Sequence, residues 1–174
     1  MFKKNNNFTQ RMIIMGLLIA LEIILTRFLS IQLPIVRIGL GFLPVAICAM
    51  MYGPIWSGVC YAIGDVLGMM LFPSPQGYFP GFTLSAFVTG VIFGIFLYNK
   101  EVKFVNAFLA SFVSLLIVTV FMNTLWLNML VGKAFLVLLP PRLLEAAFML
   151  VVEIIMIIGS YKVVIQLKNN AYSK

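Results

Sequence analysis

Three long stretches of the sequence, Ile38–Gly64, Val66–Asn99 and Phe104–Gly132, contain no Asp, Glu, Lys or Arg. A helix that crosses the hydrocarbon core of a bilayer, roughly 30 Å thick, needs about 20 predominantly apolar residues. Each stretch therefore holds one membrane-spanning helix or two. Only 10% of the 174 residues are charged, whereas a soluble domain carries about 25%. The sequence predicts an integral membrane protein.

Prolines, glycines and short charged segments divide the chain, 1–174, into six expected helices of a single transmembrane domain. Their expected ranges are 10–29, 38–51, 55–72, 82–98, 104–130 and 141–167. Proline marks several boundaries, because the residue before a proline is disfavoured in the helical conformation. The predicted fold is an all-α integral membrane protein with six transmembrane helices and structured outer loops.

The basic residues predict the orientation of these helices. With six spans, both ends of the chain lie on the same side of the membrane. Cytoplasmic segments carry an excess of Lys and Arg, and the side of the termini carries more of the 12 basic residues. That side has Lys3, Lys4, Arg11, Lys100, Lys103, Lys162, Lys168 and Lys174, and the other has Arg27, Arg37, Lys133 and Arg142. We therefore expect cytoplasmic termini, with the loops after the first, third and fifth helices outside.

Composition excludes several kinds of chemistry. The chain has no histidine, which removes His-based catalysis and His-based metal ligation. Cys48 and Cys60 lie in apolar segments and are expected to pack as small side chains. The net charge of +7 is explained by anionic lipid headgroups near the basic chain ends. We expect no catalytic residue, metal, cofactor or nucleic-acid partner.

The expected outer loops are apolar and rich in proline. The segment FPSPQGYFPGFTLSA, Phe72–Ala86, holds three prolines and two glycines, and SIQLPIV and VGKAFLVLLPP are similar in character. Loops that only connect helices in water would contain more Ser, Asn and Lys. Irregular backbone near the membrane is tolerated where it lines a cavity. These loops are therefore expected to form the lid and wall of a pocket open to the outside.

Polar and aromatic residues gather at the same outer level. Arg and Lys at the mouth suit a carboxylate or phosphate, aromatic side chains offer faces to a flat ring, and a carboxylate can accept paired N–H donors of a heteroaromatic edge. The candidate ligand-binding residues are Arg27, Asp65, Gln76, Tyr78, Phe79, Phe82, Thr83, Asn123, Trp126, Lys133, Arg142 and Glu145. The alternative for Asp65 and Arg27 is that they pair with each other.

Small residues recur four positions apart on several expected helices. Helix–helix contacts in lipid favour this spacing, because small side chains let backbones approach closely. On the third and fourth helices the pairs at 58/62, 64/68 and 90/94 are interpreted as internal packing. Gly16 and Ala20 on the first helix lie away from the polar residues. This smooth patch is interpreted as a docking surface for a second membrane protein.

Two segments carry a resemblance to a known family. RIGLGFLPVAICAMMYGPIWSGVCYAIGDVLG and YFPGFTLSAFVTGVIFGIFLY resemble the substrate-binding S components of energy-coupling factor (ECF) vitamin transporters, and within them the folate-specific group. The resemblance implies a high-affinity binding subunit in a bacterial cytoplasmic membrane. It implies docking through Gly16 and Ala20 on a transmembrane coupling protein with two ATPase subunits. The chain itself has no G-x-x-x-x-G-K-S/T motif for ATP.

For folate as the ligand, the candidate residues divide into three roles. Arg27, Lys133 and Arg142 would hold the glutamate end. Asp65 or Glu145, with Asn123, would read the edge of the pterin ring, and Tyr78, Phe82 and Trp126 would stack on rings. The loops after the first and third helices would then open once the coupling protein engages the first helix.

Three alternatives remain open at the level of sequence. The same architecture could bind another ligand, such as a queuosine precursor or pantothenate. An autonomous secondary transporter would need a coupling relay, for which Glu22 and Glu153 near mid-membrane are the candidates. A membrane enzyme would have to use Asp65 and Glu145 as acid and base.

Overall fold

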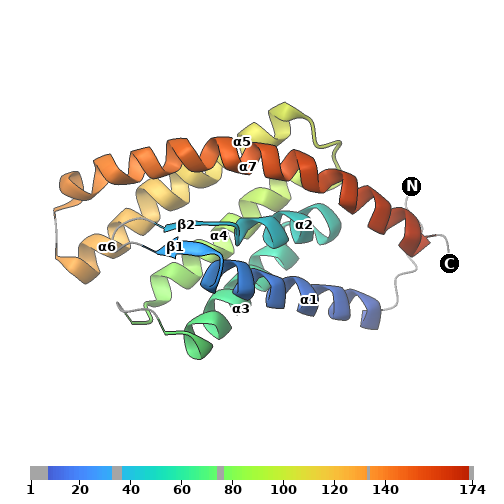
Figure 1. The fold of residues 1–174 in the computed structure, drawn as a ribbon, viewed down its shortest axis with the longest axis horizontal. Helices are drawn as coiled ribbons and strands as arrows, with labels where there is room; N and C mark the ends of the chain where they lie inside the picture. The colour runs from blue at the N-terminus through green and yellow to red at the C-terminus, as the bar shows by residue number, and fades with distance from the viewer. Residues whose placement is uncertain (1–7, 33–36, 74–76, 133, 173–174) are drawn as a thin grey trace.

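The computed structural model describes residues 8–32, 37–73, 77–132 and 134–172 of the chain. The elements are α1 (Phe8–Arg27), β1 (Ser30–Gln32), β2 (Arg37–Gly39), α2 (Phe42–Tyr52), α3 (Pro54–Leu71), α4 (Pro80–Leu97), α5 (Phe104–Ser114), the π-helical segment η1 (Leu115–Met122), α6 (Asn123–Val131) and α7 (Phe135–Tyr172). Backbone angles stay helical through both junctions of η1, so α5, η1 and α6 form one continuous helix. The predicted all-α fold is confirmed, with six helical units (Figure 1).

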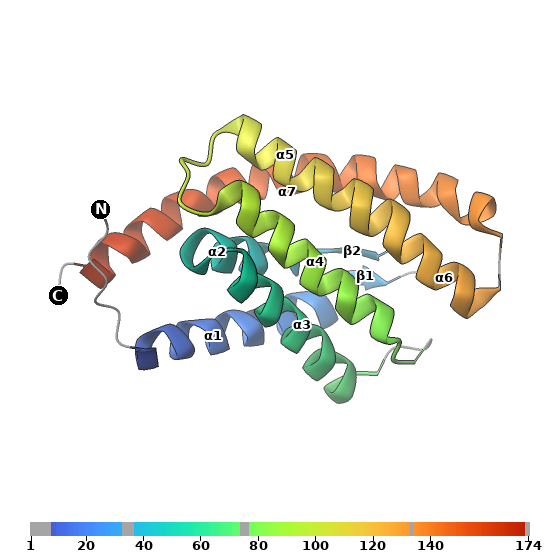
Figure 2. The same ribbon diagram turned by 180° about the vertical axis from the view of Figure 1, so that it is seen from behind.

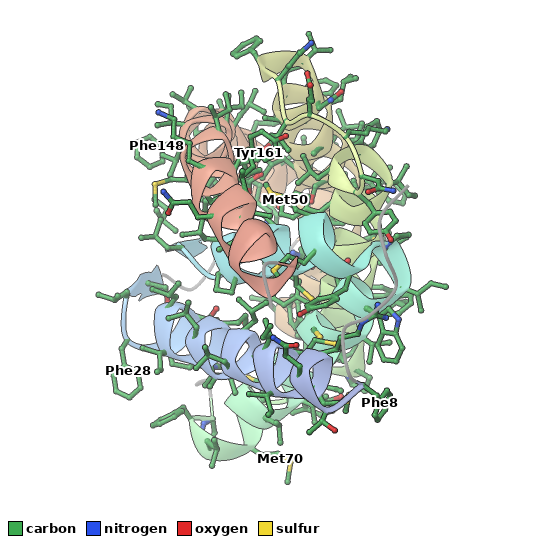
Figure 3. All side chains as sticks on the ribbon, turned by 90° about the vertical axis from the view of Figure 1, so that its right-hand side faces the viewer. Phe8, Phe28, Met50, Met70, Phe148 and Tyr161 are labelled. Carbon is green, nitrogen blue, oxygen red and sulfur yellow. The ribbon has the colours of Figure 1, made fainter. Side chains whose placement is uncertain are left out.

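Five of these units are long and apolar enough to cross a membrane: residues 8–27, 54–71, 80–97, 104–131 and 135–166. The shorter α2 lies inside the bundle, where most of its residues are buried. Figure 3 shows Met50 of α2 in the interior, whereas Met70 and Phe148 point outward. Met50 is 2% exposed, and Met70 and Phe148 are 74% and 56% exposed. An apolar exterior of this kind is what a lipid environment requires.

The two ends of the bundle differ in what they carry. The start of α1 and the end of α7 lie toward one end, together with the connection from α4 to α5 (Figures 1 and 2). At the opposite end, here called the loop end, α1 continues into the β-hairpin, α3 passes to α4, and α6 passes to α7 (Figure 2). The helix ends that flank the three expected outer loops therefore lie at the same end of the bundle.

The β-hairpin after α1 was not predicted. β1 and β2 pair antiparallel, with Ser30 opposite Gly39. A Cβ added at Gly39 would lie 2.6 Å from Ser30 Cβ, so this register requires glycine there. Because β2 takes residues 37–39, the second helix begins at Phe42 rather than at the expected residue 38.

The last helix is longer than expected from the sequence. It was expected over 141–167, but α7 begins at Phe135 and contains Pro140 and Pro141. A proline removes the hydrogen bond to the carbonyl four residues earlier. Here those carbonyls belong to Leu136 and Val137, two residues at the exposed start of the helix. The prolines are therefore tolerated near the beginning of α7.

The contact between α3 and α4 is unusually close. A Cβ on Gly90 would lie 2.6 Å from Gly58 Cα, and one on Gly94 would overlap the backbone of Pro54. The Ser57 hydroxyl also donates a hydrogen bond of 2.7 Å to the Gly90 carbonyl. Backbone-to-backbone packing of this kind is available only to very small residues.

We predict that Gly94→Ala destabilises the protein by about 1–3 kcal/mol, because α3 and α4 must move apart. Gly159→Ala on α7 is the matched control, since nothing lies within 4 Å of its added Cβ. Thermal unfolding of both variants in one detergent tests this. Equal unfolding temperatures would show that the two helices do not depend on this contact.

Candidate functional site

A hydrogen-bonded group joins α3 to the start of α4 at the loop end. The Thr83 hydroxyl donates to Asp65 Oδ2 at 2.8 Å, and its oxygen lies 3.1 Å from the Tyr78 hydroxyl. Asp65 and Thr83 are half-buried, whereas Tyr78 is exposed. The carboxylate is thus oriented by a neighbouring helix while it remains close to the surface.

An aromatic group covers the beginning of α4. Phe79 lies between two other aromatic rings, with its centroid 6.0 Å from that of Phe82 and 5.7 Å from that of Trp126. Gly81 makes this possible, because a Cβ there would overlap both Phe79 and Trp126. The Trp126 indole N–H donates a hydrogen bond of 3.0 Å to Ser85 Oγ. Trp126 can therefore contact a ligand with its ring face, because its indole N–H is already bonded.

The end of α1 places polar side chains against α3. The Thr26 hydroxyl donates to Glu22 Oε1 at 2.8 Å. A Cβ on Gly64 would overlap the Glu22 carboxylate, and one on Gly68 would lie 3.1 Å from Arg27 Nε. Gly64 and Gly68 of α3 therefore leave space for the side chains of Glu22 and Arg27 from α1. Beyond them, Phe28 and Phe72 meet edge to face with centroids 5.1 Å apart, which joins the segments after α1 and α3.

A second polar group lies between the η1–α6 helix and α7. Arg142 and Glu145 are 6% and 7% exposed. Arg142 Nη1 donates to the Thr119 carbonyl of η1 at 3.0 Å, and the Thr124 hydroxyl approaches the same oxygen at 3.4 Å. Asn123 follows directly after η1, and its Oδ1 is buried. This group is deeper in the protein than the half-buried Asp65 and Trp126.

Ten of the twelve predicted ligand-binding residues thus fall into the four groups described above, near the loop end. Gln76 and Lys133 lie outside the described residues. Sequence reasoning missed Ser85 and Thr119, which orient Trp126 and Arg142. The signal for Ser85 was its position one turn after Gly81, on a helix rich in small residues. Thr119 contributes a main-chain carbonyl, for which the sequence gives no signal.

The other intramembrane acids lie in helix–helix contacts. Glu22 sits between α1 and α3 beside Thr26. Glu153 of α7 is buried and faces Ser111 of α5. Both positions are accounted for by packing between helices, as expected for polar residues that face a bundle interior.

The expected docking patch lies on an open face of α1. Gly16 and Ala20 are exposed, and nothing lies within 4 Å of a Cβ added at Gly16. The exposed side chains around them are apolar, among them Ile13, Leu17 and Ile24. Figure 1 shows α1 at the edge of the bundle. The face is thus smooth, apolar and away from the polar groups of the loop end.

Comparison with known proteins places this arrangement in a family. Residues 10–166 match the family described as "ECF transporter, substrate-specific component". The chain is 52% identical over 157 residues to "Folate transporter FolT" of Clostridium novyi (strain NT), covering 90% of this chain and 91% of that protein. It is 26% identical over 152 residues to "Folate transporter FolT" of Leuconostoc mesenteroides, covering 84% and 81%.

A solved structure shares the fold as well. "Crystal structure of FolT bound with folic acid" superposes with a TM-score of 0.80 at 34% identity, covering 86% of this chain and 90% of that one. The match to the family covers most of the sequence, and the helical arrangement agrees with it. The chain therefore belongs to the substrate-specific components of ECF transporters.

Proposed function

We propose that this protein is the folate-binding subunit of an ECF importer, which captures folate outside the cell and releases it inside. The observation that carries the proposal is the likeness, over most of both chains, to a FolT structure that contains folic acid. Two relatives named as folate transporters support it. No observation favours the other ligands or the autonomous transporter considered from the sequence.

The chemistry of the loop end is consistent with folate. Folate has a flat pterin ring with hydrogen-bond donors and acceptors, an aminobenzoyl ring and a glutamate tail with two carboxylates. The aromatic group of Phe79, Phe82 and Trp126 offers ring faces, which suit stacking. The carboxylates of Asp65 and Glu145 can accept N–H donors. The guanidinium groups of Arg27 and Arg142 supply donors for oxygen acceptors.

We infer that the energy for transport comes from partner subunits. Folate would bind without ATP, and the loaded protein would dock on a transmembrane coupling protein that carries two ATPases. The docking surface would be the face of α1 around Gly16 and Ala20. In this orientation the termini are cytoplasmic and the loop end faces outside, as the basic residues favour.

The first test is binding of folic acid by the purified chain without ATP. We expect saturable quenching of tryptophan fluorescence that comes from Trp126, because this residue lies in the aromatic group at the loop end. Trp56 lies in the first turn of α3, at the opposite end, and is the matched control. Trp126→Phe should remove most of the quenching, and Trp56→Phe should leave it. Folded protein that shows no affinity for folic acid would defeat the proposed function.

The second test separates docking from binding. Gly16→Leu should abolish folate uptake in vesicles that contain the coupling protein, ATPases and ATP, because it places a large side chain on the docking face. Folic acid affinity of the isolated variant should stay within about twofold of the wild type, since surface substitutions away from a site have small effects. Gly159→Leu, at another exposed glycine with free space around it, should transport normally. Normal uptake by Gly16→Leu would show that partners dock elsewhere.

A further inference from the structure

Glu153 is a buried acid near the middle of α7. It is 5% exposed and belongs to the part of α7, residues 135–166, that is long and apolar enough to cross a membrane. Its Oε2 atom is buried and has no hydrogen-bond partner among the described residues. A charged side chain near the centre of a bilayer is costly unless it has a partner or reaches water. The charge state of this carboxyl therefore needs an explanation.

The helices around α7 provide no counter-ion for Glu153. The helical elements that pack most extensively on α7 are α2, α5, η1 and α6. All four belong to residues 38–64 and 104–132, which contain no Asp, Glu, Lys or Arg. Their titratable side chains are Cys48 and Tyr52 of α2, and both residue types are neutral at neutral pH. A positive charge to pair with Glu153 therefore cannot come from these helices.

The charged residues of α7 itself are too far along the helix. The nearest in the described part of the chain are Glu145 and Lys162. With a rise of 1.5 Å per residue, they lie about 12 Å and about 13.5 Å from Glu153 along the axis, and Arg142 lies about 16 Å away. An ion pair needs its charged atoms within about 4 Å. Lys162 is also exposed to the surroundings of the bundle.

Ser111 of α5 shows at which level Glu153 lies. It is fully buried and is the polar neighbour of the Glu153 carboxyl. Ser111 belongs to the first third of the continuous helix 104–131, which starts toward the end of the bundle that holds the start of α1 (Figure 2). β2 carries Arg37 and also contacts α7, but it lies on the loop-end side of α2 (Figures 1 and 2). The strand with Arg37 is therefore at a different level from Glu153.

The surroundings of Glu153 suit a proton better than a metal ion. A hard metal cation takes about six oxygen ligands, and the Glu153 carboxyl and the Ser111 hydroxyl supply far fewer. A hydroxyl can share a hydrogen bond with a carboxyl, but it carries no charge that would offset a carboxylate. A proton binds to the carboxyl itself and removes the charge without further ligands.

We propose that Glu153 is a proton-binding site, and that α7 takes up one proton when it packs against α5. The folded protein holds Glu153 as a neutral carboxylic acid. In the unfolded chain the carboxyl ionises above a pH of about 4.3. The folded state thus binds one proton more than the unfolded state, so its stability decreases as the pH rises. This assignment requires neither folate nor a partner subunit, and it stands apart from the proposed function.

Infrared difference spectra test the protonation state directly. The wild type and Glu153→Gln are compared at neutral pH in one non-ionic detergent. A carboxylic acid and a carboxylate have well-separated stretching bands. We expect the wild type minus Glu153→Gln to show a carboxylic acid band and no carboxylate bands. Glu101→Gln is the matched control, because Glu101 is exposed and pairs with Lys103, and its difference spectrum should show carboxylate bands.

The pH dependence of stability is the second readout. Between about pH 5.5 and 7.5, above the ordinary value for an unfolded carboxyl, each pH unit should lower the ratio of folded to unfolded wild type by up to tenfold relative to Glu153→Gln. Chemical denaturation of both proteins in the same detergent at several pH values measures this ratio. The comparison cancels the groups that titrate in both proteins. Glu101→Gln should follow the wild type.

Three results would overturn the assignment. The first is a difference spectrum of Glu153→Gln with carboxylate bands, which would show an ionised Glu153; bands that depend on Na⁺ would indicate a bound cation. The second is an equal pH dependence of stability in the wild type and Glu153→Gln. Should Glu153→Gln fail to fold, Glu153→Met takes its place, because a neutral acid can be replaced by an uncharged side chain of similar length. Failure of both variants to fold is the third result, since it would show that the charge is required.

Discussion

The architecture depends on the glycines that line both sides of α3. On one side, Gly58 meets Gly90 of α4, so the two backbones touch. On the other side, Gly64 and Gly68 accept the Glu22 carboxylate and the Arg27 guanidinium from α1. In lipid the hydrophobic effect does not drive helices to associate. Close packing and hydrogen bonds between the helices must stabilise the bundle instead. Through these contacts, α3 fixes the positions of α1 and α4, and hence of the loops that follow α1 and α3.

The groups near the loop end differ in how far they are buried. Asp65 and Thr83 are half-buried, as are the rings around Phe79, whereas Arg142 and Glu145 are more than nine-tenths buried. A polar group that keeps part of its surface in water has a smaller desolvation cost than one that is fully buried. The half-buried groups are therefore less costly to keep than the buried pair.

The six helical units could be predicted because uncharged stretches and proline boundaries are strong signals. The hairpin could not, since each strand has only three residues and Gly39 takes part because of its small size. η1 could not either, because LLIVTVFM is an apolar run without proline or glycine that also suits an ordinary α-helix. For the candidate site, residue types at the outer level predicted a ligand-binding region at the loop end, and this stays a prediction. The burial of Arg142 could not be predicted, because its guanidinium is bonded to the carbonyl of Thr119, a group that every residue type would provide.

The contact of Arg142 with the Thr119 carbonyl depends on the length of the helix rather than on the side chain at position 119. Any residue at position 119 provides this carbonyl. Each residue turns an α-helix by about 100°, so the loss of one residue from η1 would rotate Asn123, Thr124 and Trp126 away from their partners at once. An insertion or deletion in η1 should therefore disturb these contacts more than a substitution at position 119 does.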